Sequence, residues 1–412
     1  MQSLIKISQQ TLWQLLGKAV TSISTFVILG ILARNYGKEG VGVYTLAATY
    51  LAIFYLLADF GFNTHLLKEL KSKNLNLKIE YQKLLGTRIL WSAMLIAVAL
   101  ALLPFWPFTT ADFQKTVLIG SLAILGSAIF TTNNLVFQYR LKYEFSTLSI
   151  AVGTLAGLGI FYWLVQIKQP LPNLIFNQLI SWGFLVIVSF LLLRKIFQNI
   201  SPNFSLPYTK SLFKEAWPIA GTLALNVVYF RADAFILAFY KGVAEAGVYN
   251  LAYALFQTAL VLPAFVINSY YPLMVKSLKD VKLIALVLAL MGLVGTLLTY
   301  LLAPVIVNIL SGPDFGGAIT SLRILSLGFP VYFLSAFLMM LLIIRKKYLF
   351  LLLIYGVGLV FNLLANLNFI PQYSFLAASW VTVLAEVLIL ILQLIVLKTS
   401  LHENLAYLLR KG

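Results

Sequence analysis

Long hydrophobic runs alternate along this chain with short clusters of polar and charged residues. Each run has about 20 residues, enough to cross a hydrocarbon core of roughly 30 Å as an α-helix. A β-barrel would instead show alternating segments of roughly ten residues, a pattern that this sequence lacks. We therefore predict an all-α polytopic membrane protein with twelve transmembrane helices, at residues 11–34, 40–62, 84–106, 116–138, 146–166, 173–193, 216–240, 245–268, 282–304, 318–343, 348–368 and 374–397.

Composition supports this class. Of the 412 residues, 61% are hydrophobic and 10% charged, whereas a soluble domain is roughly half apolar and about a quarter charged. The absence of cysteine excludes disulfides, zinc–thiolate sites and cysteine nucleophiles. The sequence has no Walker motif, and its two histidines, His65 and His402, have no metal-ligand companions at a useful spacing. We predict no cofactor and no metal site.

The formal charge of +17 has a topological explanation. With twelve helices, most of the 30 lysines and arginines fall in connections on the side that holds both termini. Basic residues concentrate on the cytoplasmic side, so we predict a multi-pass protein of the cell (inner) membrane with both termini cytoplasmic. These residues also attract anionic membrane lipids weakly. Nucleic acid is not an expected partner, because its binders gather basic residues on a solvated face with stacking aromatic residues.

One segment of the first half recurs in the second half without a gap. "ILARNYGKEGVGVYTLAATY" at 31–50 and "ILAFYKGVAEAGVYNLAYAL" at 236–255 share nine of twenty residues at an offset of 205. A chance match between apolar segments would not keep two glycines and a tyrosine in register. We therefore predict an N-terminal six-helix lobe at 1–200, a cytoplasmic linker at 201–213 and a C-terminal six-helix lobe at 214–412. A pseudo-twofold axis along the membrane normal should relate the lobes.

Several motifs resemble those of a known family. "ILARNYGKEGVGVYTLAATYLAIFYLLADFGF" is similar to the N-terminal signature of polysaccharide (O-antigen type) flippases of the multidrug/oligosaccharidyl-lipid/polysaccharide exporter superfamily, with its G-x-x-x-x-G-x-Y turn and D-F-G. "RADAFILAFYKGVAEAGVYNLAYAL" resembles the D-x-x-x-L and G-x-Y-x-x-A of the second half. "SGPDFGGAITSLRILSLGFP" at 311–330 resembles the outer segment that leads into the tenth helix. The resemblance covers most of the chain.

The resemblance implies two lobes that form a V around a central cavity and open alternately to each side. It implies a flippase, not an enzyme, that moves polyprenyl-pyrophosphate-linked oligosaccharide from the cytoplasmic to the outer leaflet. Coupling to H⁺ or Na⁺ and contact with the polysaccharide polymerisation machinery are further expectations. Lipid II flippases of the same superfamily typically add two helices, for which we find no further spans.

Other functions compete with this interpretation. A cation-coupled multidrug exporter would favour acids and aromatic residues in its cavity, whereas the internal bases Lys18 and Arg231 favour an anionic substrate. A membrane glycosyltransferase or ligase generally needs an extended outer loop with catalytic residues, whereas the outer loops predicted here are short. A scaffold without transport would leave the internal charges and the repeat unexplained.

Two opposite charges lie near the middle of the seventh predicted helix, in "VVYFRADAFIL" at 227–237. Arg231 and Asp233 are about 200° apart around a helix, so each needs another partner. Arg231 would contact the pyrophosphate of the substrate, or form an ion pair, for example with Glu386. Asp233 would form a structural pair or hydrogen bond, or bind the coupling H⁺ or Na⁺. Glu386 is the most isolated acid and carries the same two alternatives.

The remaining candidates are polar residues within or beside predicted helices. Lys18 would line the inner mouth of the cavity or extend to the inner interface. Asn226 and Gln257 would bind sugar hydroxyls or join helices to each other. Asp59 belongs to the D-F-G signature and would act at a helix end or gate, and Arg34 and Arg323 would anchor the outer interface or contribute to a gate.

Overall fold

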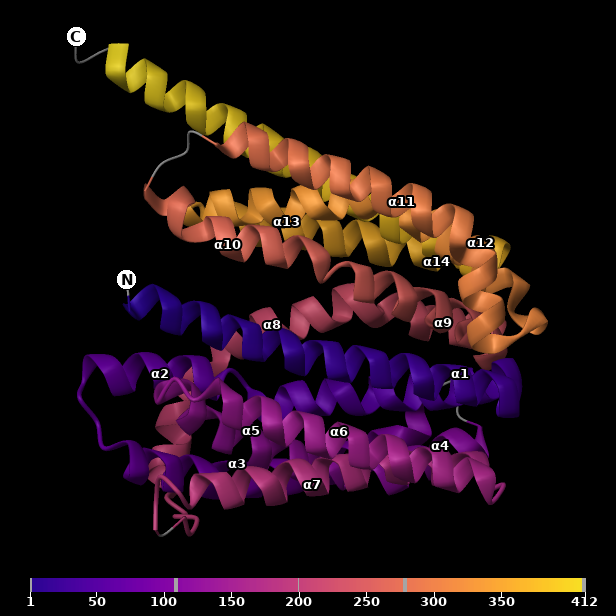
Figure 1. Ribbon diagram of the computed structural model, residues 1–412, viewed down its shortest axis with the longest axis horizontal. Helices are drawn as coiled ribbons and strands as arrows, with labels where there is room; N and C mark the ends of the chain where they lie inside the picture. Colours follow the sequence, from indigo (N-terminus) through magenta and orange to yellow (C-terminus); the bar gives the residue numbers. More distant parts are fainter. Residues whose placement is uncertain (1, 107–109, 199, 277–279, 410–412) are drawn as a thin grey trace. The chain divides into compact units, whose positions relative to one another are not determined.

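The computed structural model describes residues 2–106, 110–198, 200–276 and 280–409, and every regular element in these ranges is a helix (Figure 1). The predicted all-α class is therefore confirmed. Three short 3₁₀ helices, η1 (Leu103–Phe105), η2 (Leu171–Ile175) and η3 (Pro313–Phe315), accompany the α-helices. The α-helices are α1 (Gln2–Asp59), α2 (Phe62–Ser72), α3 (Leu77–Leu102), α4 (Ala111–Gly120), α5 (Ala123–Tyr139), α6 (Tyr143–Gln166), α7 (Phe176–Leu193), α8 (Leu206–Lys241), α9 (Val243–Ala259), α10 (Leu262–Lys276), α11 (Val281–Ser311), α12 (Gly316–Ser326), α13 (Phe329–Ile344) and α14 (Tyr348–Leu409).

The described helices are long and apolar enough for a multi-pass membrane protein. Eight segments could cross a membrane, or up to nine if Pro313–Ser326 and Phe329–Ile344, which meet at 45°, form one span. Two of the eight have 61 and 51 residues, more than twice the roughly 20 that a bilayer needs. Each contains a non-helical residue, Gly37 in α1 and Ser374 in α14, and each covers two of the predicted spans. The predicted total of twelve stays a prediction.

One side of α11 exposes a continuous row of large apolar side chains. Leu293, Leu297, Leu301 and Ile309 are between 56 and 69% exposed. Water would make such a continuous apolar surface unfavourable, and soluble proteins seldom leave one uncovered. Hydrocarbon chains solvate such a surface without this penalty, so the exposed side of α11 is typical of a membrane-spanning helix.

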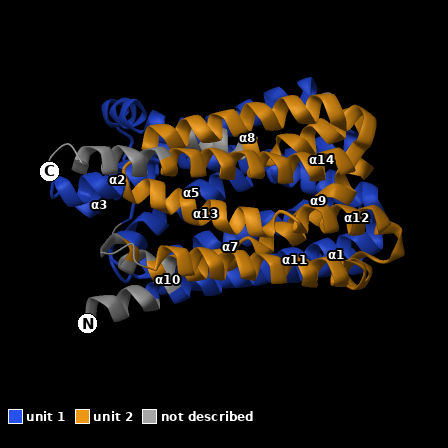
Figure 2. Cartoon of the chain, turned by 90° about the horizontal axis from the view of Figure 1, so that it is seen from above, with its two compact units in different colours: residues 1–227 blue, residues 228–412 orange. Residues whose placement is uncertain are grey.

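The chain forms two compact units, residues 1–227 and 228–412 (Figure 2). The boundary falls inside α8, which therefore begins in the first unit and ends in the second. The lobe boundaries predicted from the sequence, and the pseudo-twofold axis between the lobes, stay predictions.

Backbone geometry repeats at the same offset of 205 as the sequence. Gly37 (φ 64°, ψ −165°) and Gly242 (φ 88°, ψ 169°) interrupt the helices at equivalent positions, in a region of φ/ψ space that only glycine adopts readily. Leu141 after α5 and Lys346 after α13 both have left-handed φ values, 54° and 57°. In each case the next N–H bonds to the carbonyl five residues earlier, at 2.8 and 2.9 Å, as in a Schellman helix end.

Candidate functional site

The most enclosed acid of the second unit is Asp233 on α8, whose exposed fraction is 3%. One carboxylate oxygen accepts a hydrogen bond from the backbone N–H of Ala234 at 2.7 Å. The other accepts one from the hydroxyl of Tyr249 on α9, and the hydroxyl of Thr382 on α14 lies 3.4 Å away. A backbone N–H and two hydroxyl groups thus surround one carboxylate.

The first unit contains the same tyrosine contact without the acid. Tyr44 donates a hydrogen bond to Oδ1 of Asn177 at 2.9 Å. Tyr249 and Thr382, 205 positions after these two residues, lie 3.1 Å apart through their hydroxyls. The position equivalent to Asp233 is Ile28, which cannot accept a hydrogen bond. The two halves therefore share the contact between helices but differ in charge.

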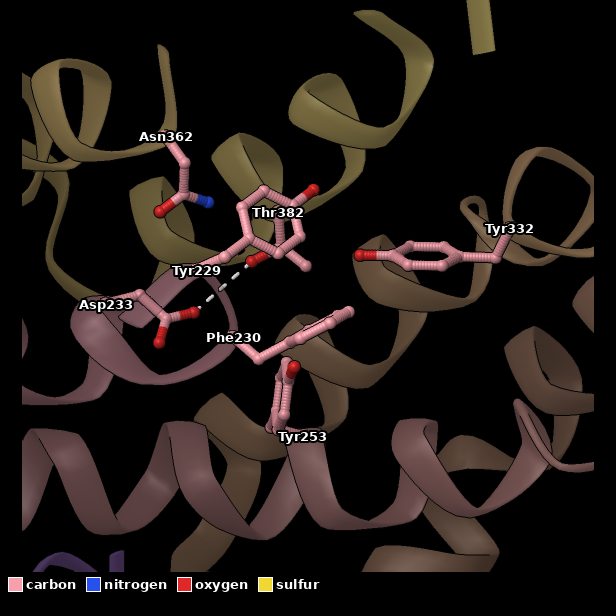
Figure 3. A pocket seen from close by; sticks show the side chains of 7 residues that line it. All are labelled: Tyr229, Phe230, Asp233, Tyr253, Tyr332, Asn362 and Thr382. Atoms are coloured by element: carbon pink, nitrogen blue, oxygen red, sulfur yellow. Dashed lines mark hydrogen bonds between the residues drawn. The ribbon is translucent and has the colours of Figure 1, made fainter. Parts of the chain in front are cut away.

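A narrow pocket adjoins Asp233 (Figure 3). Its cavity volume is about 10 Å³, roughly the space of one water molecule. The pocket could hold a small ion or a water, and it is too small for a sugar or a drug. Its lining combines one acid with aromatic, hydroxyl and amide groups from α8, α9, α13 and α14: Tyr229, Phe230, Asp233, Tyr253, Tyr332, Asn362 and Thr382.

Glu386 lies one helical turn after Thr382 on α14 and has an exposed fraction of 4%. It accepts a hydrogen bond from the hydroxyl of Tyr229 on α8 at 3.3 Å. Tyr229 precedes Asp233 by one turn, so α8 and α14 meet through two successive polar contacts. Among the residues whose side chains are described, no base lies within 4.0 Å of the carboxylate of Glu386.

Arg231 lies on a different side of α8 from Asp233 and is half-buried, as their angular separation predicts. Its guanidinium lies 5.3 Å from the ring centroid of Tyr253 and 3.5 Å from the amide oxygen of Gln257, both on α9. Within the described part of the chain, no carboxylate is within ion-pair distance of Arg231. The structure thus brings together Arg231 and Gln257, two of the predicted substrate-binding residues, and does not form the alternative pair of Arg231 with Glu386.

Lys18 and Arg34 lie on α1 of the first unit, where both are exposed. Arg323 on α12 donates to the backbone carbonyl of Tyr300 at 3.0 Å and lies over its ring, which agrees with an anchoring role. Asn226 belongs to α8, but its side chain is outside the described part of the structure.

An ion pair in the first unit was missed by the sequence analysis. Asp59, the last residue of α1, pairs with Arg88 of α3 at 2.7 Å. Arg88 is fully buried and also contacts the hydroxyl of Thr132 at 3.2 Å. Residue 88 falls inside the span predicted at 84–106, so the sequence carried a signal for a charge within a helix. Its partner Asp59, a predicted gate residue, lies at the end of α1.

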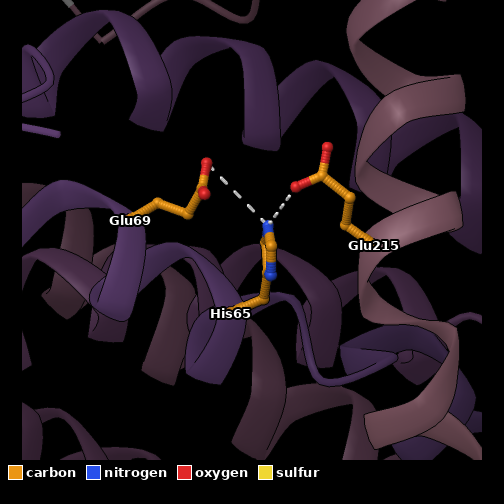
Figure 4. Close-up of side chains that lie close together, drawn as sticks. All are labelled: His65, Glu69 and Glu215. Carbon is orange, nitrogen blue, oxygen red and sulfur yellow. Dashed lines mark ion pairs between the residues drawn. The ribbon is translucent and has the colours of Figure 1, made fainter. Parts of the chain in front are cut away.

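His65 has two carboxylate neighbours, whereas the sequence predicted none at a useful spacing. Glu69 follows it by four residues on α2, a spacing that places both side chains on one helix face. The fold adds Glu215 from α8, 150 residues along the chain from His65 (Figure 4). The contact with Glu69 could have been predicted from the spacing, whereas the contact with Glu215 required the tertiary structure.

The architecture defines the class of this protein. A solved structure described as a lipid II flippase MurJ in an inward closed conformation has a TM-score of 0.76 at 13% identity, covering 95% of this chain and 87% of that one. An inward-facing multidrug resistance MATE family transporter of the MOP superfamily has a TM-score of 0.69 at 10% identity, covering 93% and 95%. The fold is therefore that of these membrane transporters.

The sequence identifies the family. Residues 7–278 match the family of polysaccharide biosynthesis proteins, and the chain belongs to that family. A putative O-antigen transporter of Shigella flexneri is 24% identical over 298 residues, 68% of each chain. One of Shigella dysenteriae is 30% identical over 125 residues, which span about a third of either protein. The predicted family is thus confirmed, and these relatives carry the names of transporters rather than enzymes.

Proposed function

We propose that this protein is a flippase that moves polyprenyl-pyrophosphate-linked oligosaccharide from the cytoplasmic to the outer leaflet by alternating access of its two lobes. The family and the names of its relatives support this proposal. The proposal includes a place in the cell (inner) membrane with both termini cytoplasmic, and contact with the polysaccharide polymerisation machinery. The protein would act as a transporter and not as an enzyme.

The observation that carries the proposal is the state of Arg231. This arginine is half-buried within a predicted transmembrane helix and lacks a carboxylate partner among the described residues. A charge near the middle of a bilayer costs about 2.5–3.5 kcal/mol on insertion scales, so it persists where it has a function or a partner. A pyrophosphate supplies oxygen atoms that match the two-pronged geometry of guanidinium. An anionic headgroup is therefore the ligand class that fits Arg231.

Other side chains would complete this substrate contact. Gln257 lies next to Arg231, and its amide oxygen is 3.5 Å from the guanidinium. This long contact is weak, so the amide can bind a sugar hydroxyl instead. The ring of Tyr253 supports the guanidinium from one side. Lys18 and Asn226 are proposed as further contacts to the headgroup and the sugars. Asp59, Arg34 and Arg323 are proposed to act at the ends of the path as gate residues.

Asp233 is the proposed site of ion coupling. Burying a carboxylate without a positive charge is costly, so such a group takes up a proton or a cation. The pocket beside Asp233 fits one small ion and offers oxygen atoms of Asp233, Thr382 and Asn362. One turn after Asn362, the amide oxygen of Asn366 is buried without a hydrogen-bond donor. Glu386 is proposed as the second coupling acid, and H⁺ and Na⁺ are the candidate ions.

Reconstitution tests the proposal. Purified protein in liposomes should change the leaflet accessibility of a fluorescent polyprenyl-pyrophosphate-linked sugar, and the Arg231→Ala variant should lose this activity. Activity on cationic drugs without activity on the lipid-linked sugar would support a multidrug exporter instead. Transfer of the glycan to an acceptor by the purified protein would support a glycosyltransferase or ligase.

A further inference from the structure

The cluster of His65, Glu69 and Glu215 has the composition of a metal site (Figure 4). Nε2 of His65 lies 3.2 Å from Oε2 of Glu215 and 4.0 Å from Oε2 of Glu69. All three ligand atoms lie within 4.8 Å of one another. Zinc ligands at bond lengths of about 2.0–2.1 Å in a tetrahedron are roughly 3.3 Å apart. Small side-chain rotations would therefore bring the three atoms to ligand spacing.

Packing outside the cluster holds its two helices together. Gly61, with a φ of 72°, forms the turn before α2, and a Cβ there would lie 2.4 Å from a methyl group of Ile219 on α8. The rings of Phe60 and Phe62 both contact Phe213, which is also on α8. The ligand atoms from α2 and α8 are thus brought together by close backbone approach and aromatic contacts, independently of any attraction between the charges.

Each carboxylate already has one oxygen fixed by a further donor. Oε1 of Glu215 accepts a hydrogen bond from the hydroxyl of Ser211 at 2.8 Å. Oε1 of Glu69 pairs with Nζ of Lys73 at 2.7 Å. The remaining oxygen of each carboxylate faces His65, as in metal sites whose outer contacts orient the ligands.

The donor set favours one group of ions. A neutral imidazole nitrogen with two carboxylate oxygens suits Zn²⁺ and similar transition-metal ions, whereas Mg²⁺ prefers oxygen ligands alone. The side chains are 15, 22 and 44% exposed for His65, Glu69 and Glu215, so an ion and a water could reach them. We propose that His65, Glu69 and Glu215 bind one divalent transition-metal ion, with water as the fourth ligand, and that this ion clamps α2 to α8. The proposal does not depend on the substrate.

The chain provides a matched control, because it has two histidines and no cysteine. Zinc affinity is measured on the purified full-length protein, without a histidine tag, by competition with a coloured chelator. We expect one Zn²⁺ per chain for the wild type and for the His402→Ala variant. His65→Ala and Glu215→Gln should each weaken binding by at least about tenfold, and Ser211→Ala by about tenfold through loss of an outer contact.

A second measurement distinguishes a metal site from a simple ion-pair contact. Co²⁺ should give visible absorption bands of low-coordinate geometry that disappear in Glu69→Gln, and Zn²⁺ but not Mg²⁺ should raise the unfolding temperature. Both measurements test the proposal even if His65→Ala does not fold, because they use only the wild type and Glu69→Gln. Wild-type protein that binds no Zn²⁺, or binding that survives both His65→Ala and Glu215→Gln, would overturn the proposal and leave only polar contacts between His65 and two carboxylates.

Discussion

The hydroxyl of Tyr249 donates a hydrogen bond to the buried carboxylate of Asp233. Its counterpart in the first half, Tyr44, donates to the neutral amide of Asn177. The same tyrosine therefore connects helices in both halves, but its acceptor is a carboxyl group in only one of them. Variants of Tyr249 and Tyr44 can therefore separate the contact that this tyrosine makes between helices from its effect on the acid.

The first prediction concerns ion coupling. Tyr249→Phe removes a hydrogen bond that stabilises the ion-free carboxylate of Asp233, a contact worth about 1.5–3 kcal/mol. Asp233 should then bind the coupling cation more tightly, so the ion concentration for half-maximal transport should fall at least about tenfold. Asp233→Asn should make transport independent of the H⁺ and Na⁺ gradients. The measurement is lipid-linked sugar transport in liposomes with imposed gradients. Tyr44→Phe is the control and should leave the ion dependence unchanged; equal effects of both tyrosine variants would argue against coupling at Asp233.

The second prediction concerns Arg231. Arg231→Lys keeps the charge but removes the two-pronged donor geometry, so it should reduce transport at least about tenfold, and Arg231→Ala should reduce it further. Initial rates in liposomes measure the effect. Arg345→Ala is the matched control, because Arg345 at the end of α13 is also half-buried in the second unit but has no proposed role in transport. A fully active Arg231→Ala variant would remove the main support for an anionic substrate.

The third prediction separates Glu386 from Asp233. Glu386 accepts a hydrogen bond from Tyr229 on α8. Glu386→Gln preserves that contact, so a structural role predicts normal transport and normal ion dependence. A coupling role predicts that transport loses its dependence on pH while its Na⁺ dependence stays. The pH profile in liposomes decides between the two roles, with Tyr229→Phe as a test of the hydrogen bond alone.

The fourth prediction concerns the buried pair in the first unit. Asp59→Ala leaves the fully buried guanidinium of Arg88 without its carboxylate, and removing one partner of such a pair costs about 3–5 kcal/mol. The unfolding temperature in detergent should fall sharply. The double variant Asp59→Asn with Arg88→Met should recover much of the loss, because no unpaired charge remains. A double variant as unstable as Asp59→Ala would contradict this explanation.

The fifth prediction concerns the repeated glycine turn. Gly242→Ala forces a side chain into a backbone region that costs about 1–3 kcal/mol, even though no heavy atom lies within 4 Å of the new Cβ. Gly356→Ala, in the same unit and also in open space, has ordinary helical geometry and should stabilise by about 0.5–1 kcal/mol. Thermal unfolding of both variants should therefore shift in opposite directions, and shifts of the same sign would refute backbone strain as the cause.

The sequence by itself determined the class of fold and the repeat. Hydrophobic runs report which segments prefer lipid, and this preference belongs to each segment alone. Gly37 and Gly242 could be paired from the sequence because the backbone geometry of a turn restricts its residues locally. Arg231 was recognisable as unusual for the same reason, since a charge in an apolar run is visible without knowing its neighbours.

The tertiary structure decided which side chains meet. Asp233 and Thr382 are 149 residues apart, and Arg88 reaches Asp59 across 29 residues. Nothing in the spacing of these residues marks them as partners, because the packing of whole helices selects which faces come into contact. The same selection placed Glu386 beside Tyr229 rather than Arg231, and brought Glu215 to His65. Hydrophobicity thus sets where the helices form, and side-chain packing sets which charges find partners.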